Sequence, residues 1–146
     1  VSPDLGGGPR ARIYAYDRQA PNAIIVKRRP KPGFADVMNL FGDVRGKTAV
    51  IIDDIVDTAG SLCEGARALE KRGAKRIFAS CSHAILSDPA VQRINESPIE
   101  KLVIPDTIPL PPEKQSDKFV VLSLADALGD VMMRIQSHRS VSQLFR

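Results

Sequence analysis

The sequence has no tryptophan, and its aromatic residues are limited to five phenylalanines and two tyrosines. Proteins that bind single-stranded nucleic acid without base preference stack the bases on aromatic side chains, so this scarcity argues against such a platform. The formal net charge of +4 would suit a nucleic acid, but it suits a phosphorylated metabolite equally well. We therefore expect no nucleic acid partner and turn to small anionic ligands.

Cysteine and histidine are also scarce. Cys63 and Cys81 show no CxxC pattern, which indicates free thiols in a reducing compartment and favours a cytoplasmic protein. His83 and His138 have no partners at metal-ligand spacing, so we expect no zinc site. No segment reads as a signal peptide and no apolar run is long enough to cross a bilayer, so we expect no membrane partner.

A length of 146 residues fits one domain with its own core. We therefore interpret residues 1–146 as a single domain. The chain opens at Val1 in Gly- and Pro-rich loop chemistry, so we expect it to be a piece of a longer protein.

Apolar periodicity predicts strands that alternate with helices. The expected strands cover residues 23–26, 35–41, 48–52, 76–82, 101–104 and 119–122, and the expected helices cover residues 10–19, 61–72, 88–95 and 124–135. The β-branched run at 48–52 is typical of a strand buried on both faces. We predict an α/β fold, a parallel sheet flanked by helices, with its ligand at the carboxyl ends of the strands.

The strongest functional signal lies at that edge. Asp53 and Asp54 end the 48–52 strand, and Asp57-Thr-Ala-Gly-Ser follows where a helix starts. Hydroxyls and N–H groups at a helix start bind phosphate, and carboxylates bind sugar hydroxyls or a divalent cation. A helix cap by Thr58 or Ser61 would explain one hydroxyl, but not two carboxylates at the end of a buried strand. The pattern predicts a sugar-phosphate site.

Two further features are weaker by themselves. Lys27, Arg28, Arg29 and Lys31 form a dense cationic loop, which alone reads more simply as a solvated surface or a nucleic-acid contact. Beside a sugar-phosphate site, such cations suit charge that develops during phosphoryl transfer. Asp4 lies in a Gly/Pro loop and alone reads as a turn residue.

Together, several segments resemble one family. Residues 1–7 (VSPDLGG), 27–30 (KRRP), 53–61 (DDIVDTAGS), 82–90 (SHAILSDPA) and 140–145 (SVSQLF) are similar, in this order, to class I ribose-phosphate pyrophosphokinases. The DDIVDTAGS motif is shared more widely with type I phosphoribosyltransferases, whereas KRRP makes the resemblance specific. The resemblance implies a type I phosphoribosyltransferase-like fold, a homo-oligomer that is a hexamer in the family, and a chain corresponding to the carboxyl-terminal half of the enzyme.

The resemblance also implies a reaction. ATP and ribose 5-phosphate would give 5-phosphoribosyl 1-pyrophosphate and AMP, with Mg²⁺ as cofactor and phosphate or ADP as effectors. By position, Lys27 and Arg29 would stabilise the transferring diphosphoryl group, and Asp4 would be a metal ligand. Asp53 and Asp54 would bind the ribose hydroxyls, directly or through a cation.

The remaining site positions follow from the same resemblance. The 5-phosphate would be cradled by Asp57, Thr58, Ala59, Gly60 and Ser61. Ser140 and Phe145 match a tail that helps to form an allosteric nucleotide site between subunits. The missing half would carry most adenine contacts and a histidine metal ligand, so we expect this piece alone to be weakly active or inactive.

Three alternatives stay open. A phosphoribosyltransferase that consumes phosphoribosyl pyrophosphate would share residues 53–61, but would need a base-binding hood and no KRRP loop. A non-catalytic regulatory homologue would have lost the cationic loop or the acidic pair, and both are intact. A basic nucleic-acid module is the least expected, because the acidic pair would repel phosphate.

Overall fold

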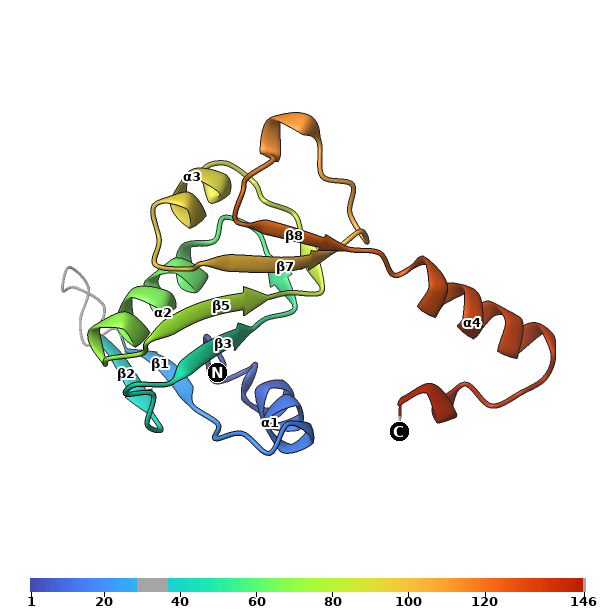
Figure 1. Cartoon of the computed structure of the whole chain (residues 1–146), viewed down its shortest axis with the longest axis horizontal. Helices are drawn as coiled ribbons and strands as arrows, with labels where there is room; N and C mark the ends of the chain where they lie inside the picture. The colour runs from blue at the N-terminus through green and yellow to red at the C-terminus, as the bar shows by residue number, and fades with distance from the viewer. Residues whose placement is uncertain (29–36, 146) are drawn as a thin grey trace.

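A computed structural model describes residues 1–28 and 37–145 (Figure 1). The helices are α1 (Gly8–Asp17), α2 (Gly60–Lys71), α3 (Ala90–Asn95) and α4 (Ala125–Gln136), with short 3₁₀ turns η1 (Pro112–Lys114) and η2 (Ser142–Phe145). The strands are β1 (Ile24–Arg28), β2 (Val37–Phe41), β3 (Thr48–Ile52), β4 (Ile55–Val56), β5 (Arg76–Ser80), β6 (His83–Ala84), β7 (Lys101–Pro105) and β8 (Phe119–Leu122).

A four-stranded parallel sheet forms the centre of the molecule, in the order β3-β5-β7-β8. Helix α2 connects β3 to β5, and α3 connects β5 to β7. Apolar side chains of both helices join those of the sheet in one buried cluster, because a parallel sheet must cover its apolar face with its crossover helices. The predicted α/β fold with helices flanking a parallel sheet is confirmed.

One expectation about this sheet is wrong. Strand β3 is not buried on both faces: Ala49 and Ile51 are buried, whereas Thr48 is exposed and Val50 is 41% exposed. The opposite face also carries Val120, which is 37% exposed. A β-branched run reports strand propensity, and this propensity does not distinguish one covered face from two.

The hairpin β1–β2 is antiparallel and separate from the main sheet (Ile24 pairs with Phe41). Of the strand expected at 35–41, residues 37–41 form β2 outside the parallel sheet, and residues 35 and 36 lie outside the described residues. The hairpin packs on α2, where an added Cβ at Gly65 would lie 3.0 Å from Ile25 Cδ1. This close approach explains why a glycine occupies the middle of α2, where it weakens helix propensity.

The amino terminus is tied to the site edge of the sheet. The Ser2 N–H donates to the Ala23 carbonyl at 2.9 Å, and the Ile52 N–H donates to the Val1 carbonyl at 3.0 Å. The Val1 ammonium donates to the Val50 carbonyl at 2.8 Å. These bonds hold the loop that follows, with Asp4, next to the carboxyl end of β3.

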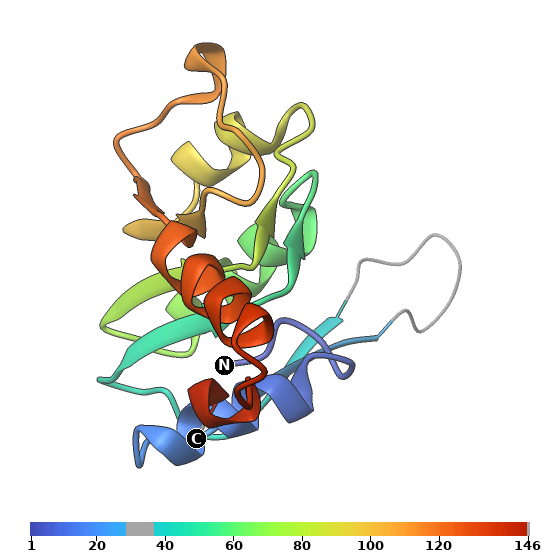
Figure 2. The ribbon, with the colours of Figure 1, turned by 90° about the vertical axis from the view of Figure 1, so that its right-hand side faces the viewer.

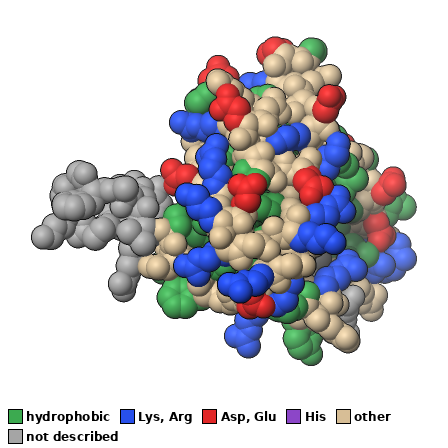
Figure 3. Space-filling view, turned by 60° about the vertical axis from the view of Figure 1, so that its left-hand side comes forward, with side chains coloured by type: hydrophobic (Ala, Val, Ile, Leu, Met, Phe, Trp, Pro, Cys, Tyr) green, Lys and Arg blue, Asp and Glu red, His purple; other side chains and the backbone are tan. Residues whose placement is uncertain are grey.

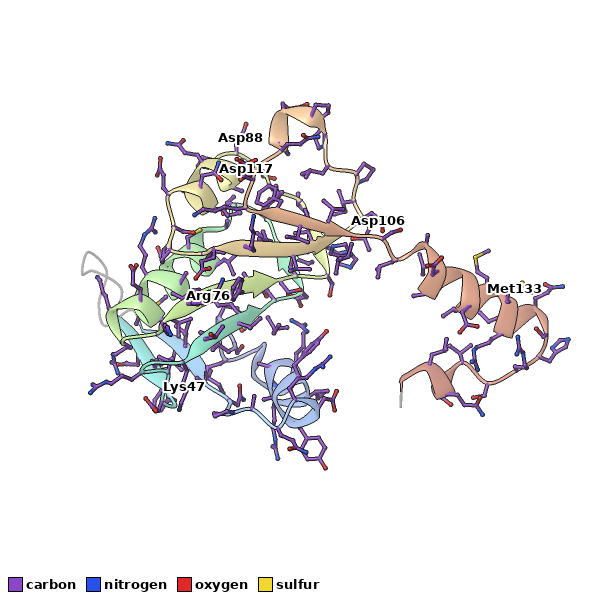
Figure 4. All side chains as sticks on the ribbon, in the orientation of Figure 1. Lys47, Arg76, Asp88, Asp106, Asp117 and Met133 are labelled. Atoms are coloured by element: carbon purple, nitrogen blue, oxygen red, sulfur yellow. The ribbon has the colours of Figure 1, made fainter. Side chains whose placement is uncertain are left out.

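Helix α4 and the segment after it extend away from the sheet in Figure 1, and Figure 2 gives the perpendicular view. The predicted amphipathic helix is present, but none of its residues is buried. Leu128 is 58% exposed and Met132 69% exposed; the labelled Met133 points outward in Figure 4. In the described part of the chain, every helix is too short or too polar to cross a bilayer.

Both cysteines are buried free thiols, as expected. Burial raises the pKa of Cys81 to about 11, so this thiol stays protonated and unreactive near neutral pH. Packing is the role that the structure gives to these two side chains.

Candidate functional site

The acidic pair lies directly beyond β3, and its backbone is fixed by the neighbouring strand. The Asp53 N–H donates to the Ser80 carbonyl at 2.9 Å and so continues the β3–β5 pairing by one residue. The Asp54 carbonyl accepts the N–H groups of Ser82 at 3.0 Å and His83 at 2.8 Å. The short parallel pair β4–β6 follows at once. The backbone of the two aspartates is therefore held to the neighbouring strand by hydrogen bonds at the carboxyl edge of the sheet.

The two carboxylates differ in environment. Arg10 Nη2 on α1 donates to Asp54 Oδ2 at 2.7 Å, and this bond lowers the pKa of Asp54 below its ordinary value. Asp53 is half-buried, and burial raises the pKa of its carboxyl above the ordinary value. Asp54 is thus already partnered, while Asp53 has the most to gain from a bound cation or hydroxyl donor. Arg10 could not be found by spacing, because 44 residues separate the partners.

Asp4, which the resemblance implied to be a metal ligand, lines the same cavity as the acidic pair. Its Oδ1 accepts the Gly7 N–H at 2.7 Å, and the Ser2 hydroxyl donates to its carbonyl at 2.7 Å. An added Cβ at Gly7 would lie 2.7 Å from Ser2 Oγ, so this tight turn requires glycine. Within the described residues, no three carboxylate, imidazole or thiol groups converge as a ready metal site. A cation here would need oxygen atoms from the substrate, which is how Mg²⁺ is usually held.

The loop from Asp57 to Ser61 leads into α2 with an unusual cap. Ala59 is the N-cap residue in the left-handed region (φ 56°, ψ 14°), and no side chain caps the helix. The alternative explanation of this motif, a helix cap by Thr58 or Ser61, is therefore not what the structure shows. The first helical bond runs from the Cys63 N–H to the Ala59 carbonyl. The N–H groups of residues 60–62 precede it and have no intrahelical acceptor.

This backbone arrangement suits an anion. A left-handed alanine costs roughly 1–2 kcal/mol, and such strain concentrates at functional sites. Successive N–H groups after a left-handed residue form a concavity that binds phosphate, with the positive end of the helix dipole behind it. A cavity of about 280 Å³ is lined here by Asp4, Asp53, Asp54 and residues 55–62. The structure thus gathers the acidic pair, Asp4 and the whole predicted phosphate loop around one small cavity.

A further residue reaches this loop from α3. Arg93 Nη1 donates to the Thr58 carbonyl at 2.9 Å. An added Cβ at Gly60 would lie 3.7 Å from the same nitrogen. No sequence pattern indicates this contact, because Arg93 lies 35 residues beyond Thr58 and looks like an ordinary helix residue.

The remaining predicted residues that the structure describes do not line this cavity. Lys27 is in β1, where its backbone pairs with Met38, and Arg29 lies outside the described residues. The Ser140 carbonyl accepts a bond from Arg134 Nη1 at 3.1 Å, and Phe145 ends η2. Both belong to the segment beyond α4, which lies away from the sheet in Figure 1. The structure does not bring them to the acidic pair.

Basic and acidic side chains are interspersed over the face shown in Figure 3. The Arg76 guanidinium pairs with Glu100 at 2.7 Å, and Lys47 pairs with Asp43 at 2.8 Å. A protein that binds nucleic acid through its phosphates presents a stripe of one sign. The mixed charges of the face in Figure 3 give no support to the nucleic-acid alternative.

Comparison with known proteins gives consistent matches. A family model described as "Phosphoribosyl synthetase-associated domain" matches residues 11–146. Ribose-phosphate pyrophosphokinase 1 of Listeria monocytogenes is 54% identical over 145 residues, which cover 99% of this chain and 46% of that protein. The ribose-phosphate pyrophosphokinase of Bacillus subtilis is 50% identical over the same shares.

A solved structure agrees. The crystal structure of phosphoribosylpyrophosphate synthetase from Mycobacterium smegmatis matches with a TM-score of 0.86 and 31% identity, over 94% of this chain and 44% of that one. The chain therefore spans about half the length of the relatives it matches. These shares give the extent of the match and not its position, so the expected assignment to the carboxyl-terminal half finds no support in them.

Proposed function

The chain belongs to the phosphoribosyl synthetase-associated domain family, and from this premise we propose that it carries the ribose 5-phosphate side of a diphosphoryl-transfer site. In the proposed reaction, the 1-hydroxyl of ribose 5-phosphate attacks the β-phosphorus of ATP, the bond to the α-phosphate oxygen breaks, and AMP leaves. The products are 5-phosphoribosyl 1-pyrophosphate and AMP. The proposal treats residues 1–146 as one domain of a longer enzyme.

The observation that carries the proposal is the shared cavity at the end of β3. Its N–H groups at residues 60–62 and the hydroxyls of Thr58 and Ser61 suit a phosphate, while the carboxylates of Asp53 and Asp54 suit sugar hydroxyls. A sugar phosphate needs both kinds of group within one small site. We assign the 5-phosphate to residues 57–61 and the ribose hydroxyls to the acidic pair.

The donor set also fits a magnesium ion. Asp4 and Asp53 line the same cavity, and Mg²⁺ is usually held by one or two carboxylates together with substrate oxygens. When bound, the ion would neutralise charge on the transferring group. Burial disfavours the charged form of Asp53 and so raises its pKa. A bound cation would offset this unfavourable free energy.

The remaining assignments rest on the resemblance alone. Lys27 and Arg29 would stabilise charge on the diphosphoryl group as it transfers. Ser140 and Phe145 would contribute to an effector site for phosphate or ADP between copies of a homo-oligomer. The exposed apolar side chains of α4, which precedes them, suit packing on another protein surface.

A calorimetric titration with ribose 5-phosphate and Mg²⁺ tests the site. Thr58→Val removes a hydroxyl of the 57–61 loop with little change of volume. The control, Thr48→Val, removes an exposed hydroxyl at the opposite end of β3. Loss of one hydrogen bond to a charged group costs about 1.5–3 kcal/mol, so we expect Thr58→Val to weaken binding at least about tenfold and Thr48→Val to bind like the unmodified chain. Equal affinities of the two variants would overturn the phosphate-loop assignment.

A further inference from the structure

Arg93 is a cation with a fixed position behind the loop of residues 57–61. It stands on α3, which is anchored by Ala90 and Ile94, both fully buried. Its Nη1 reaches the Thr58 carbonyl at 2.9 Å. Since α3 packs on α2, the guanidinium and the first turn of α2 belong to one packed unit. The position of this charge is set by the core, and the side chain is only half-exposed.

Within the part of the chain that the structure describes, no acidic side chain pairs with Arg93. The ion pairs among the described residues join Arg10 to Asp54, Lys47 to Asp43, Arg76 to Glu100 and Arg134 to Asp130. Arg93 takes part in none of these pairs, and among the described residues its side chain donates to a neutral carbonyl, that of Thr58. The guanidinium of Arg93 therefore keeps its positive charge next to the loop of residues 57–61, in a site that also holds carboxylates.

The bond to Thr58 also determines what the loop presents. A peptide unit directs its carbonyl and its N–H to opposite sides, so the bond that holds the Thr58 carbonyl toward α3 also fixes the direction of the Ala59 N–H in the same unit. Ala59 then adopts its left-handed conformation, and α2 begins at Gly60. Without Arg93, the partial negative charge of that carbonyl would lack its partner, and the left-handed turn would lose a contact that opposes its strain. The arginine thus supports the backbone that leads into residues 60–62, which line the cavity.

We propose that Arg93 is a positioning residue that orients the 57–61 loop for a phosphate group and supplies the positive charge behind it. This inference rests on the proposed function and names a determinant of phosphate recognition that lies outside the 53–61 motif. Its effect belongs to the phosphate and not to the sugar, because its contact is with Thr58 and not with the acidic pair. Removal of Arg93 should therefore lower the affinity by the same factor for every ligand whose phosphate binds to the loop.

The test is a calorimetric titration of the whole chain with two probes, inorganic phosphate and ribose 5-phosphate, each with Mg²⁺. Arg93→Leu removes both the bond and the charge, and Arg93→Lys keeps a charged donor. Arg67→Gln, an exposed arginine on α2, is the control. We expect Arg93→Leu to weaken both probes by the same factor, at least about tenfold. Arg93→Lys should stay within about threefold of the unmodified chain, and Arg67→Gln should have no effect.

Three results would overturn the inference. Arg93→Leu could bind both probes like the control, or Arg93→Lys could be as weak as Arg93→Leu. Ribose 5-phosphate could also weaken much more than phosphate, which would mean that the whole edge is disturbed and that the role is merely structural. If the unmodified chain binds phosphate but not ribose 5-phosphate, the proposed function fails. The phosphate affinities of the Arg93 variants then still test the role of Arg93. If it binds neither probe, both proposals fail.

Discussion

At the scale of single residues, adjacent carboxylates in this site have opposite electrostatic environments. Asp54 is ion-paired with Arg10 at 2.7 Å, whereas the carboxyl of Asp53 is half-buried and has a raised pKa because of that burial. Sequence could name the two acids and the phosphate loop, because these types are adjacent in the chain. It could not name Arg10 or Arg93, because both reach the site from other elements, 44 and 35 residues away.

The raised pKa of Asp53 predicts a gain in stability when its charge is removed. A carboxyl whose folded pKa lies above its ordinary value of 3.8 stabilises the fold only in its protonated form, and this contribution is lost as pH rises through the folded pKa. Asp53→Asn keeps an oxygen for the Asp54 N–H, a bond of 2.9 Å. We expect it to be more stable than the unmodified chain at about pH 7, by no more than about 1 kcal/mol, because water screens a half-buried group.

Urea unfolding between about pH 4 and pH 8 measures this difference. The gain of Asp53→Asn should shrink as pH falls toward the ordinary value, since both chains are then neutral at this position. Asp117→Ala is the control, because Asp117 is exposed near the start of β8, away from the site (Figure 4). A variant that is less stable than the unmodified chain at neutral pH would show that burial does not penalise this carboxylate.

At the scale of elements, α2 and α4 show what amphipathic spacing can and cannot predict. Both helices are twelve residues long, and both were expected from the same 3.6-residue period. Leu69 of α2 is fully buried, whereas Leu128 of α4 is 58% exposed. A period fixes which side chains share a face, but the surface that this face meets depends on the rest of the fold. The pairing of β1 with β2 in a separate hairpin escaped prediction for the same reason.

This contrast predicts very different costs for one substitution at two helical leucines. Leu69→Ala leaves a cavity in the core and should destabilise the chain by about 2–5 kcal/mol. Leu128 is mostly exposed, so Leu128→Ala uncovers little buried surface and should change stability by no more than about 0.5 kcal/mol. The midpoints of urea unfolding give both numbers, and similar losses for the two variants would mean that α4 packs on the body in solution.

At the scale of the whole molecule, the described residues form one small cavity suited to the proposed sugar phosphate, and its lining offers little that could hold a nucleotide as well. The cavity at the acidic pair measures about 280 Å³, just below the usual range of about 300–1,000 Å³ for ligand sites. Among the described residues that line it, there is no aromatic side chain on which adenine could stack. The relatives are about twice as long as this chain, so their other half has room for the groups that present ATP.

We therefore expect these 146 residues to bind ribose 5-phosphate and yet to transfer almost nothing to it. Phosphoryl transfer depends on holding both reactants in line, and this positioning is worth effective concentrations of about 10⁵–10⁸ M. Loss of the ATP side should lower the rate of AMP release at least about 10⁴-fold relative to a full-length relative such as the Bacillus subtilis enzyme. The measurement follows AMP formed from ATP, ribose 5-phosphate and Mg²⁺, with Thr58→Val as a control for contaminating activity. Turnover by the unmodified chain within about a hundredfold of the full-length enzyme, and lost in Thr58→Val, would show that residues 1–146 hold both halves of the site.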